Sequence, residues 1–300
     1  MTIKKNRSPE YYRDQIFSLT SLPTLPIIAT EILRASREDN LSVSQLLPIM
    51  EKDPPLAMKV LKIANSAYYG MRTDVKSLRH AIVIIGMREL SNIAFSFSVI
   101  KELSHDIGGY NLNWKQFWKH SVACGYVAQL VVEGLEYPTQ TSFYTLGLLH
   151  DIGKLVLYRI DPESYIESFE LANNKRCSSF VAEKEVFGVT HSDVGMWIAE
   201  RWKMTEEVIN AIGYHHHPEK ISDYRFKVCV SLLQIADMVC NFKSINFGTE
   251  YDSSIPQSED GWKILQNEFK RLDGVDFESF VSGLEDELET IKKMVDLLQT

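Results

Sequence analysis

The stretch that decides the fold is TLGLLHDIGKLVLYRI, residues 145–160, in which His150 and Asp151 interrupt an apolar run. Its composition predicts a buried helix that begins near residue 141, after Pro138. An unpaired charge in such a run is unfavourable by roughly several kcal/mol unless a bound cation or a salt bridge offsets it. A metal ion would therefore explain the pair, whereas a His-Asp pair on its own is more often a surface or capping feature of a helix.

The geometry of a helix limits what this pair can bind. Side chains of neighbouring helical residues diverge by about 100°, yet both can reach one ion placed against the flank of the helix. The carboxylate of Asp151 can also bridge to a second ion. One or two divalent ions are therefore expected at His150 and Asp151.

Other imidazoles and carboxylates accompany the pair. Six of the eight histidines lie between residues 120 and 217, each in a predicted helix or at its edge. With Asp151 and Asp237 they suit Fe, Mn, Zn, Co or Ni better than the all-oxygen sites of Ca²⁺ and Mg²⁺, and no thiolate is implied. The sequence thus predicts a metal site of imidazole and carboxylate ligands.

The rest of the chain has the periodicity of helices rather than of strands. Ser42 and the run Asp53-Pro54-Pro55 mark helix starts, and Gly70 marks a helix end. Helices are expected at residues 25–36, 41–52, 56–70, 77–86, 87–103, 113–135, 141–160, 178–188, 190–203, 205–217, 224–242, 261–272 and 277–300. The predicted fold class is all-α, with a polar linker at about residues 244–260.

Composition bounds the class of protein. The chain has 300 residues, of which 45% are hydrophobic and 24% are charged, as in ordinary soluble globular proteins. No run approaches the roughly 18 apolar residues needed to cross a bilayer, and the N-terminus has no apolar signal core. The four cysteines are scattered, without a CxxC pair, which indicates reduced thiols. We therefore expect a cytoplasmic protein with no membrane partner.

The negative charge is concentrated at one end of the chain. The formal net charge is −8, and residues 246–300 account for all of it, with 5 Lys and Arg against 13 Asp and Glu. An acidic tail on a neutral body argues against nucleic acid as a partner, because binding to phosphate groups needs a basic face. The tail itself is expected to be a solvated acidic helix.

The spacing of the candidate ligands resembles a known signature. His120, the pair His150-Asp151 and Asp237 form an H…HD…D pattern that resembles the metal-binding signature of the HD superfamily of phosphohydrolases. Lys154 completes HDIGK and could meet a phosphate oxygen as a point charge. Two further features, His191 and the run 215–217, resemble the additional histidines of the HD-GYP subgroup, which binds two or three metals.

A longer resemblance covers roughly residues 17–245. The chain is similar to the HDOD family, HD-related output domains of bacterial signalling, in several segments. These are LPTLP (22–26), DPPLAMKVLKIANSAYYG (53–70), AIVIIG (81–86), GLLHDIGK (147–154), VFGVTHSDVG (186–195) and IGYHHHPE (212–219). The resemblance implies an all-helical domain of two packed lobes, at about 17–110 and 111–245. A segment 1–16 precedes it, and an acidic helical extension, 246–300, follows it.

The chain departs from the HD-GYP pattern in two places. The segment after the histidines is KISDYRF rather than D-G-x-G-Y-P, and Gln116 stands where the trinuclear sites have a glutamate. Hydrolysis of cyclic dinucleotides is therefore not implied. The family pattern favours His215 and His216 as ligands over His217, although a slip of one position stays open. The sequence THSD also permits His191 to be an exposed helix start capped by Thr190.

Two other motifs carry weaker expectations. The echo HDIGGYN at residues 105–111 lacks a following apolar run and a lysine, and its aspartate and glycines are turn formers, so we interpret it as a turn. The segment NSAYYG (65–70) is expected to use Asn65 to bond backbone, with Tyr68 and Tyr69 packing between the lobes.

Three functional hypotheses follow. In the first, the chain is a signalling output protein that acts mainly on partner proteins and holds one or two divalent ions; its proposed ligands are His120, His150, Asp151, His191, His215, His216 and Asp237. In the second it is a metal-dependent phosphohydrolase or phosphodiesterase of a cyclic nucleotide or dinucleotide, in which a metal-bound water is the nucleophile and Asp151 and Lys154 are catalytic. In the third it is a metal-free scaffold.

Overall fold

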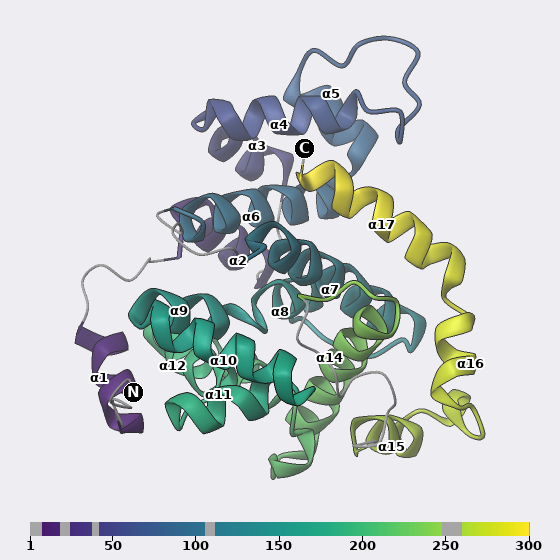
Figure 1. Cartoon of the computed structure of the whole chain (residues 1–300). Coiled ribbons are helices and arrows are strands. Elements are labelled where there is room, and N and C mark those ends of the chain that lie inside the picture. Colours follow the sequence, from purple (N-terminus) through teal and green to yellow (C-terminus); the bar gives the residue numbers. More distant parts are fainter. Residues whose placement is uncertain (1–7, 19–24, 38–41, 106–111, 248–259, 300) are drawn as a thin grey trace. The chain divides into compact units, whose positions relative to one another are not determined.

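The chain is built from helices. The computed structural model describes residues 8–18, 25–37, 42–105, 112–247 and 260–299, and within these ranges it contains no strand (Figure 1). The expected all-α fold class is therefore confirmed.

The described helices belong to two compact units, as the two-lobed expectation requires. Unit 1 comprises Met1–Leu22, Ile107–Tyr137 and Phe143–Leu288, and unit 2 comprises Pro23–Asp106, Pro138–Ser142 and Glu289–Thr300. All the predicted metal ligands fall in unit 1.

The described residues of unit 2 before residue 106 form five helices. They are α2 (Ile27–Arg37), α3 (Val43–Glu51), α4 (Pro54–Ala64), α5 (Leu78–Ile85) and α6 (Met87–Leu103). Helices α2 and α4 pack against α6. Helix α4 begins as the sequence predicts, because the Asp53 carboxylate accepts the N–H of Leu56 at 3.1 Å and prolines occupy its first turn.

Helix α4 ends at Ala64 rather than at the predicted Gly70. The side chain of Asn65 forms two hydrogen bonds with the backbone of Val75: its amide donates to the carbonyl at 2.9 Å, and its oxygen accepts the N–H at 2.7 Å. This clamp holds the chain after α4 in a turn, with Tyr68 and Tyr69 edge to face. The expectation that Asn65 bonds backbone is thus confirmed.

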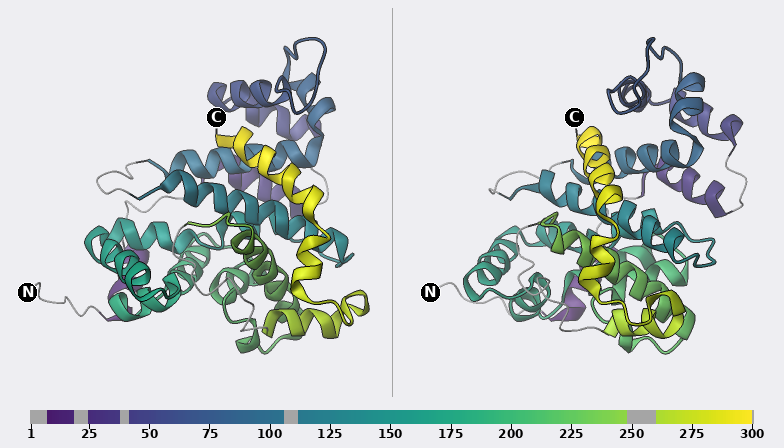
Figure 2. Two further views of the ribbon diagram at one scale, coloured as in Figure 1. Left: turned by 45° about the vertical axis from the view of Figure 1, so that its right-hand side comes forward. Right: turned by 90° about the vertical axis from the view of Figure 1, so that its right-hand side faces the viewer.

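Unit 1 holds most of the remaining helices, which Figure 2 shows from two further directions. They are α1 (Pro9–Ser18), α7 (Trp114–Gly134), α8 (Phe143–Leu149), α9 (Ile152–Ile160), α10 (Pro162–Lys175), α11 (Ser179–Phe187), α12 (His191–Arg201), α13 (Glu206–Tyr214), η1 (Pro218–Lys220), α14 (Tyr224–Phe242), α15 (Asp260–Glu268), η3 (Lys270–Leu272) and α16 (Phe277–Ser282). Helix α7 packs against α8 and α14, while α12 packs against α9 and α13.

Helices α1 and α10 were not expected from the sequence. Both have weak amphipathic patterns, and tertiary packing supports them. Tyr12 and Ile16 of α1 and Tyr165 of α10 are buried in one apolar cluster that also contains Phe187 and Ile198. Burial in this cluster supplies the stability that local propensity does not.

The described part of the acidic extension from residue 260 on is helical, as expected, but has more breaks than predicted. Its last predicted helix is divided into α16 and α17 (Glu285–Gln299) around Gly283. Most of the linker predicted at 244–260 lies outside the described residues. The HDIG echo is only partly described: α6 ends at Leu103 and His105 is exposed beyond it, whereas residues 106–111 lie outside the described ranges.

One further test concerns membrane-spanning length. Among the described residues, no single helix is long and apolar enough to cross a membrane, although the pair α5 and α6, bent by 114°, passes on length and composition.

Candidate metal centre

The His-Asp pair lies at a break between two helices, not inside one. The prediction of a continuous helix over 141–160 is wrong at this point, because α8 ends at Leu149 and α9 begins at Ile152. Asp151 is the N-cap residue of α9, yet its side chain makes no capping hydrogen bond. The break lets both side chains turn to the interior, where a straight helix would have spread them apart.

Two glycines explain how the break is packed. A methyl group at Gly147 would overlap the backbone carbonyl of Cys124, so α8 lies directly on α7. A methyl group at Gly153 would overlap the backbone of His191, so the start of α9 lies directly on the start of α12. Only glycine fits at position 153, because the backbones of α9 and α12 approach each other closely there. This close approach also brings His191 near Asp151.

The structure brings the seven predicted ligands together, as follows: His120 from α7, His150 and Asp151 from the break, His191 from α12, His215 and His216 from the end of α13, and Asp237 from α14. All are buried except His216, which is partly exposed. His191 is the first residue of α12 with Thr190 as its cap, as predicted, but it is fully buried rather than exposed.

His217 is directed elsewhere. Its Nδ1 atom lies 3.1 Å from a carboxylate oxygen of Glu219, and 37% of its side chain is exposed. Helix α13 ends at Tyr214, before the three histidines, instead of continuing to residue 217 as predicted. The turn that follows places His215 and His216 inward, so the geometry favours the first of the two registers that the sequence left open.

The first half of the cluster comprises His120, His150 and Asp237. The Nε2 atom of His120 lies 3.2 Å from Asp237 Oδ1 and 3.7 Å from Asp151 Oδ2. The Nε2 atom of His150 lies 3.8 Å and 3.5 Å from the same two oxygens. Each of the two imidazole nitrogens therefore lies 3.2–3.8 Å from a carboxylate oxygen of Asp151 and of Asp237, and all four atoms are of the kind that binds transition metals.

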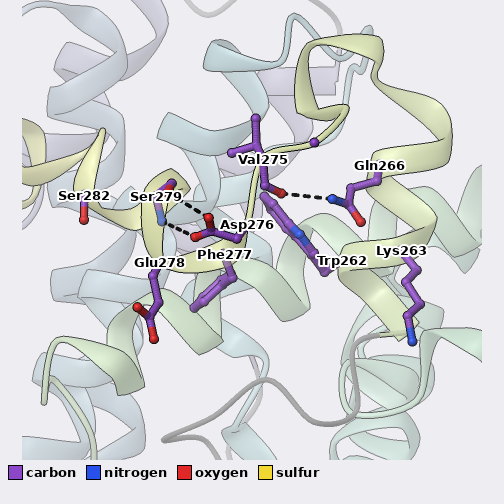
Figure 3. Close-up of a pocket in the computed structure, with 10 residues that line it drawn as sticks. Trp262, Lys263, Gln266, Val275, Asp276, Phe277, Glu278, Ser279 and Ser282 are labelled. Atoms are coloured by element: carbon purple, nitrogen blue, oxygen red, sulfur yellow. Dashed lines mark hydrogen bonds between the residues drawn. The ribbon is translucent and has the colours of Figure 1, made fainter.

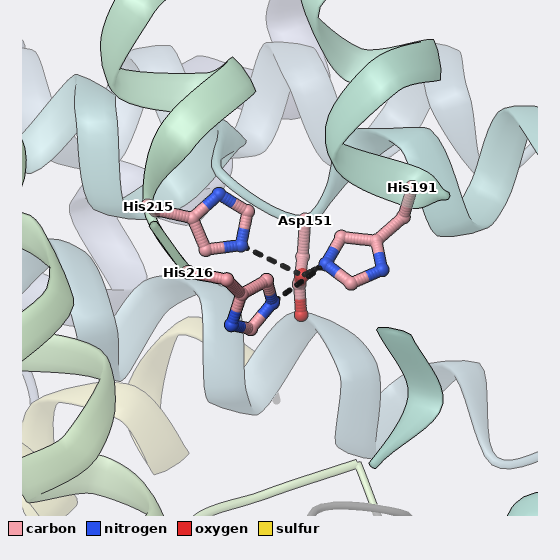
Figure 4. A group of neighbouring side chains, drawn as sticks. All are labelled: Asp151, His191, His215 and His216. Atoms are coloured by element: carbon pink, nitrogen blue, oxygen red, sulfur yellow. Dashed lines mark hydrogen bonds and ion pairs between the residues drawn. The ribbon is translucent and has the colours of Figure 1, made fainter. Parts of the chain in front are cut away.

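The second half comprises His191, His215 and His216 (Figure 4). The other oxygen of Asp151, Oδ1, lies 3.3 Å from Nε2 of His191 and 3.8 Å from Nε2 of His215. The Nε2 atoms of His191 and His216 are 2.9 Å apart. Asp151 consequently presents one carboxylate oxygen to each half, which is the arrangement expected of a bridging carboxylate.

Four of the imidazoles are fixed from behind. Nδ1 lies 2.7 Å from the Ile245 carbonyl in His120, 2.7 Å from the Gly147 carbonyl in His150 and 2.8 Å from the Ile212 carbonyl in His215. A carbonyl only accepts, so each Nδ1 carries the proton, and neutral imidazole then leaves its lone pair on Nε2. In all three rings Nε2 is the atom that faces the cluster.

His191 is fixed by a carboxylate. Its Nδ1 atom and its backbone N–H both lie 2.6 Å from Oε2 of Glu183, a buried residue of α11. Carboxylate–histidine pairs of this type orient metal ligands and raise their basicity. Sequence reasoning missed Glu183, because nothing in the spacing of residues 183 and 191 marks their contact.

The distances suit metal ions. Ligand bonds of about 2.0–2.2 Å place neighbouring donors about 2.8–3.6 Å apart in octahedral or tetrahedral geometry, close to the separations in both halves. Three inward atoms, His150 Nε2, Asp151 Oδ1 and His215 Nε2, are buried and have no hydrogen-bond partner among the residues that the structure describes. Buried polar atoms are normally satisfied, so these atoms fit a bound cation.

Electrostatics divides the histidines into charged and neutral ones. Burial opposes a charge on His120, but the hydrogen bond to Asp237 and the charges of Asp237 and Asp151 outweigh it and raise its pKa to about 9. Burial and the neighbouring charges of His150 and His191 lower the pKa of His215 to about 3. In the metal-free protein at neutral pH, His120 therefore carries a proton that a metal must displace.

Lys154 points into the cluster and not toward solvent. Its ammonium donates to Asp151 Oδ2 at 2.8 Å, and both side chains are 2% exposed. Although burial opposes ionisation, the charges of Lys154 and the nearby histidines lower the pKa of Asp151 well below its usual range. Lys154 thus keeps Asp151 in the anionic form that a bridging ligand needs.

Two other polar side chains have supporting positions. Asn241, one turn after Asp237 on α14, donates to Asp237 Oδ1 at 3.0 Å. Gln116, one turn before His120 on α7, donates its side-chain N–H to the backbone carbonyl of Asn246 at 3.0 Å.

A separate hollow lies on unit 1, away from these ligands (Figure 3). It measures about 980 Å³ and is lined by residues of α15, α16 and the turn between them, including Trp262 and Phe277. Its Asp276 carboxylate already caps α16, accepting the N–H of Ser279 at 2.7 Å and its hydroxyl at 2.9 Å. None of the predicted site residues lines it.

A family model for the HDOD domain matches residues 22–218. The chain belongs to the HDOD family. This domain is also similar to an uncharacterised protein of Treponema pallidum (strain Nichols), with 27% identity over 252 residues, covering 83% of this chain and 47% of that protein. The chain thus spans about half the length of this relative.

Solved structures share the fold. An HDOD domain protein of unknown function from Geobacter sulfurreducens superposes with a TM-score of 0.79 and 24% identity, covering 96% of this chain and 97% of that one. A Shewanella amazonensis SB2B protein described as a candidate phosphohydrolase superposes with a TM-score of 0.69 and 22% identity, at the same coverages. At these identities the likeness concerns the fold.

Proposed function

We propose that this HDOD protein is a cytoplasmic signalling output protein that holds one or two divalent metal ions and acts mainly by binding partner proteins. The observation that carries the metal site is the orientation of the imidazoles. Three rings are tied to backbone carbonyls through Nδ1 and a fourth to Glu183, and their Nε2 atoms face the two oxygens of Asp151 or Asp237.

Different side chains of the cluster would hold each of the two ions. His120, His150 and Asp237 would hold a first ion, while His191, His215 and His216 would hold a second, with Asp151 between them. The donor set suits Fe, Mn, Zn, Co or Ni. Lys154 would keep Asp151 ionised, and Glu183 would hold His191 in the orientation that directs Nε2 inward.

Burial supports a role in holding an ion over a role in turnover. Of the seven proposed ligands, only His216 and Asp237 are more than 2% exposed, and Lys154 is already bonded to Asp151. The burial of these ligands leaves little of either half open to a substrate. Such a site suits structural stabilisation or sensing, with the output delivered through a protein partner.

Elemental analysis of protein purified without chelators tests the metal site. We expect one or two equivalents of Fe, Mn, Zn, Co or Ni per chain in the natural sequence and in His217→Ala, a control that removes the neighbouring outward-facing histidine. His150→Ala should lower the content. Absence of stoichiometric metal from the natural protein would leave the metal-free scaffold as the better description.

A metal-dependent phosphohydrolase is the second candidate. The observation that favours it is the Lys154 ammonium, 2.8 Å from the bridging carboxylate, where it could neutralise a phosphate oxygen next to an ion. A bound ion would supply a water of lowered pKa as nucleophile. A screen of nucleotides, cyclic dinucleotides and simple phosphodiesters decides, and hydrolysis that persists unchanged in Asp151→Ala would remove this candidate.

A further inference from the structure

We propose that the Cys124 thiolate is an additional ligand of the ion in the first half of the cluster. This inference rests on the proposed metal site. Sγ of Cys124, a ring nitrogen of His150 and a carboxylate oxygen of Asp237 all lie within 4.8 Å of one another. All three residues are buried, and two of them already belong to the first half.

The packing of α7 and α8 holds Sγ of Cys124 close to His150. Cys124 lies one helical turn after His120 on α7, so both side chains project from the same face of that helix. Gly147 packs against the backbone of Cys124, and the Nδ1 atom of His150 is bonded to the Gly147 carbonyl at 2.7 Å. Gly147 therefore contacts the backbone of Cys124 and also holds the ring of His150, which keeps the two side chains close together.

A second buried thiol, that of Cys240, lies beside Cys124. Cys240 lies three residues after Asp237 on α14, is fully buried, and is hydrogen-bonded to Cys124. Burial and the hydrogen bond with Cys240 raise the pKa of the Cys124 thiol. A cation bound there would therefore have to displace the Cys124 proton to solvent before the thiolate could serve as its ligand. The step needs no oxidant, because a coordinated thiol is simply deprotonated.

The consequence is that the two halves prefer different metals. Soft thiolate ligands favour Zn²⁺, Fe²⁺ and Co²⁺ over Mn²⁺. The second half offers imidazole and carboxylate from Asp151, His191, His215 and His216, with no sulfur in that group. We therefore infer that the first half discriminates against Mn²⁺ more strongly than the second half does.

X-ray absorption at the zinc edge tests the assignment. Protein loaded with one equivalent of Zn²⁺ should show a sulfur scatterer at about 2.3 Å, in the natural sequence and in Cys229→Ser. Cys229, on α14, is a matched control, since it is fully buried like Cys124 but belongs to no metal-holding group among the described residues. Cys124→Ser should lose the sulfur signal while still binding zinc.

The same measurements distinguish an error about Cys124 from an error about the metal site itself. Zinc that binds the natural protein without any sulfur scatterer overturns the role of Cys124 but leaves the proposed metal site standing. Failure to bind zinc at all contradicts the proposed function itself. A sulfur signal that survives in Cys124→Ser and is lost in Cys240→Ser would assign the ligand to Cys240, against the proposal.

An affinity measurement covers the case in which Cys124→Ser is poorly folded. Circular dichroism identifies the folded variants among Cys124→Ser and Cys124→Ala. In a folded variant we expect the ratio of Zn²⁺ affinity to Mn²⁺ affinity at the first half to fall by about tenfold or more, because only the softer ion loses a preferred ligand. An unchanged ratio would overturn the proposal.

Discussion

The two halves of the cluster share Asp151 but are built from different groups. The first half adds a second carboxylate, Asp237, and two imidazoles tied to backbone carbonyls. The second half adds three imidazoles, one of them tied to Glu183, and includes the partly exposed His216. The first half therefore has more negative charge and less contact with solvent, so we expect it to bind its ion more tightly and to exchange it more slowly.

The largest effect should come from the residue that the halves share. Asp151→Asn removes the anion from both positions and should abolish metal binding in each, measured by elemental analysis and by titration with Zn²⁺. The same change breaks the buried pair with Lys154, whose ammonium is 2.8 Å away. Breaking a buried pair typically destabilises a protein by about 3–5 kcal/mol.

A double variant separates these two consequences. Asp151→Asn combined with Lys154→Met should recover much of the free energy of unfolding, since no lysine charge then remains beside the amide, but it should not recover metal binding. Recovery of metal binding in the double variant would contradict the bridging role of Asp151.

Changes confined to one half should affect one ion. His215→Ala removes a ligand of the second half only, so the protein should keep its tighter ion and lose the weaker one. Asp237→Asn should do the reverse, with the larger loss of affinity. Competition titrations with a chromophoric chelator measure both constants, and equal losses at both positions in either variant would show that the halves are not separate.

A smaller effect is expected from the group behind His191. Glu183→Gln keeps the size of the side chain but removes the charge that accepts from Nδ1 of His191 at 2.6 Å. Metal affinity at the second half should fall by about 10–100-fold, the usual range for loss of such a supporting group. The first half should be unchanged. An equal loss of metal affinity at the first half would mean that Glu183 stabilises the fold as a whole rather than orienting His191.

Metal affinity should also depend on pH. The pKa of His120 is raised to about 9 in the metal-free protein, chiefly because the interactions with Asp237 overcome the effect of burial. Metal binding must displace that proton, so affinity at the first half should rise with pH up to about 9, and this one proton contributes up to about tenfold per pH unit. Titrations between pH 6 and pH 9 measure the slope, and affinity independent of pH would refute this protonation state.

Much of the site follows from residue type, because imidazoles and carboxylates on apolar helices require a shared cation or partner. The seven predicted residues do converge in the structure. The break at His150 was not predictable from periodicity, since apolar residues flank it on both sides and tertiary packing of Gly153 on His191 fixes it. Glu183 was missed for the same reason, because its role depends on how α11 and α12 pack.

The helix boundaries also depend partly on local residues and partly on tertiary contacts. The starts of α4 and α12 carry local signals in Asp53 and Thr190, and both were predicted. The end of α4 depends on the bond between Asn65 and the backbone of Val75, ten residues away. Local sequence specifies where these helices begin, whereas long-range contacts decide where α4 ends.

The central claim is that the inward Nε2 atoms hold a cation on each side of Asp151. Anomalous diffraction from crystals of the metal-loaded protein tests it directly. We predict one peak bonded to His120, His150, Asp151 and Asp237, and at higher metal concentration a second bonded to Asp151, His191, His215 and His216. Metal bound only outside this cluster, with Lys154 still paired to Asp151 and no peak beside either, would contradict the account.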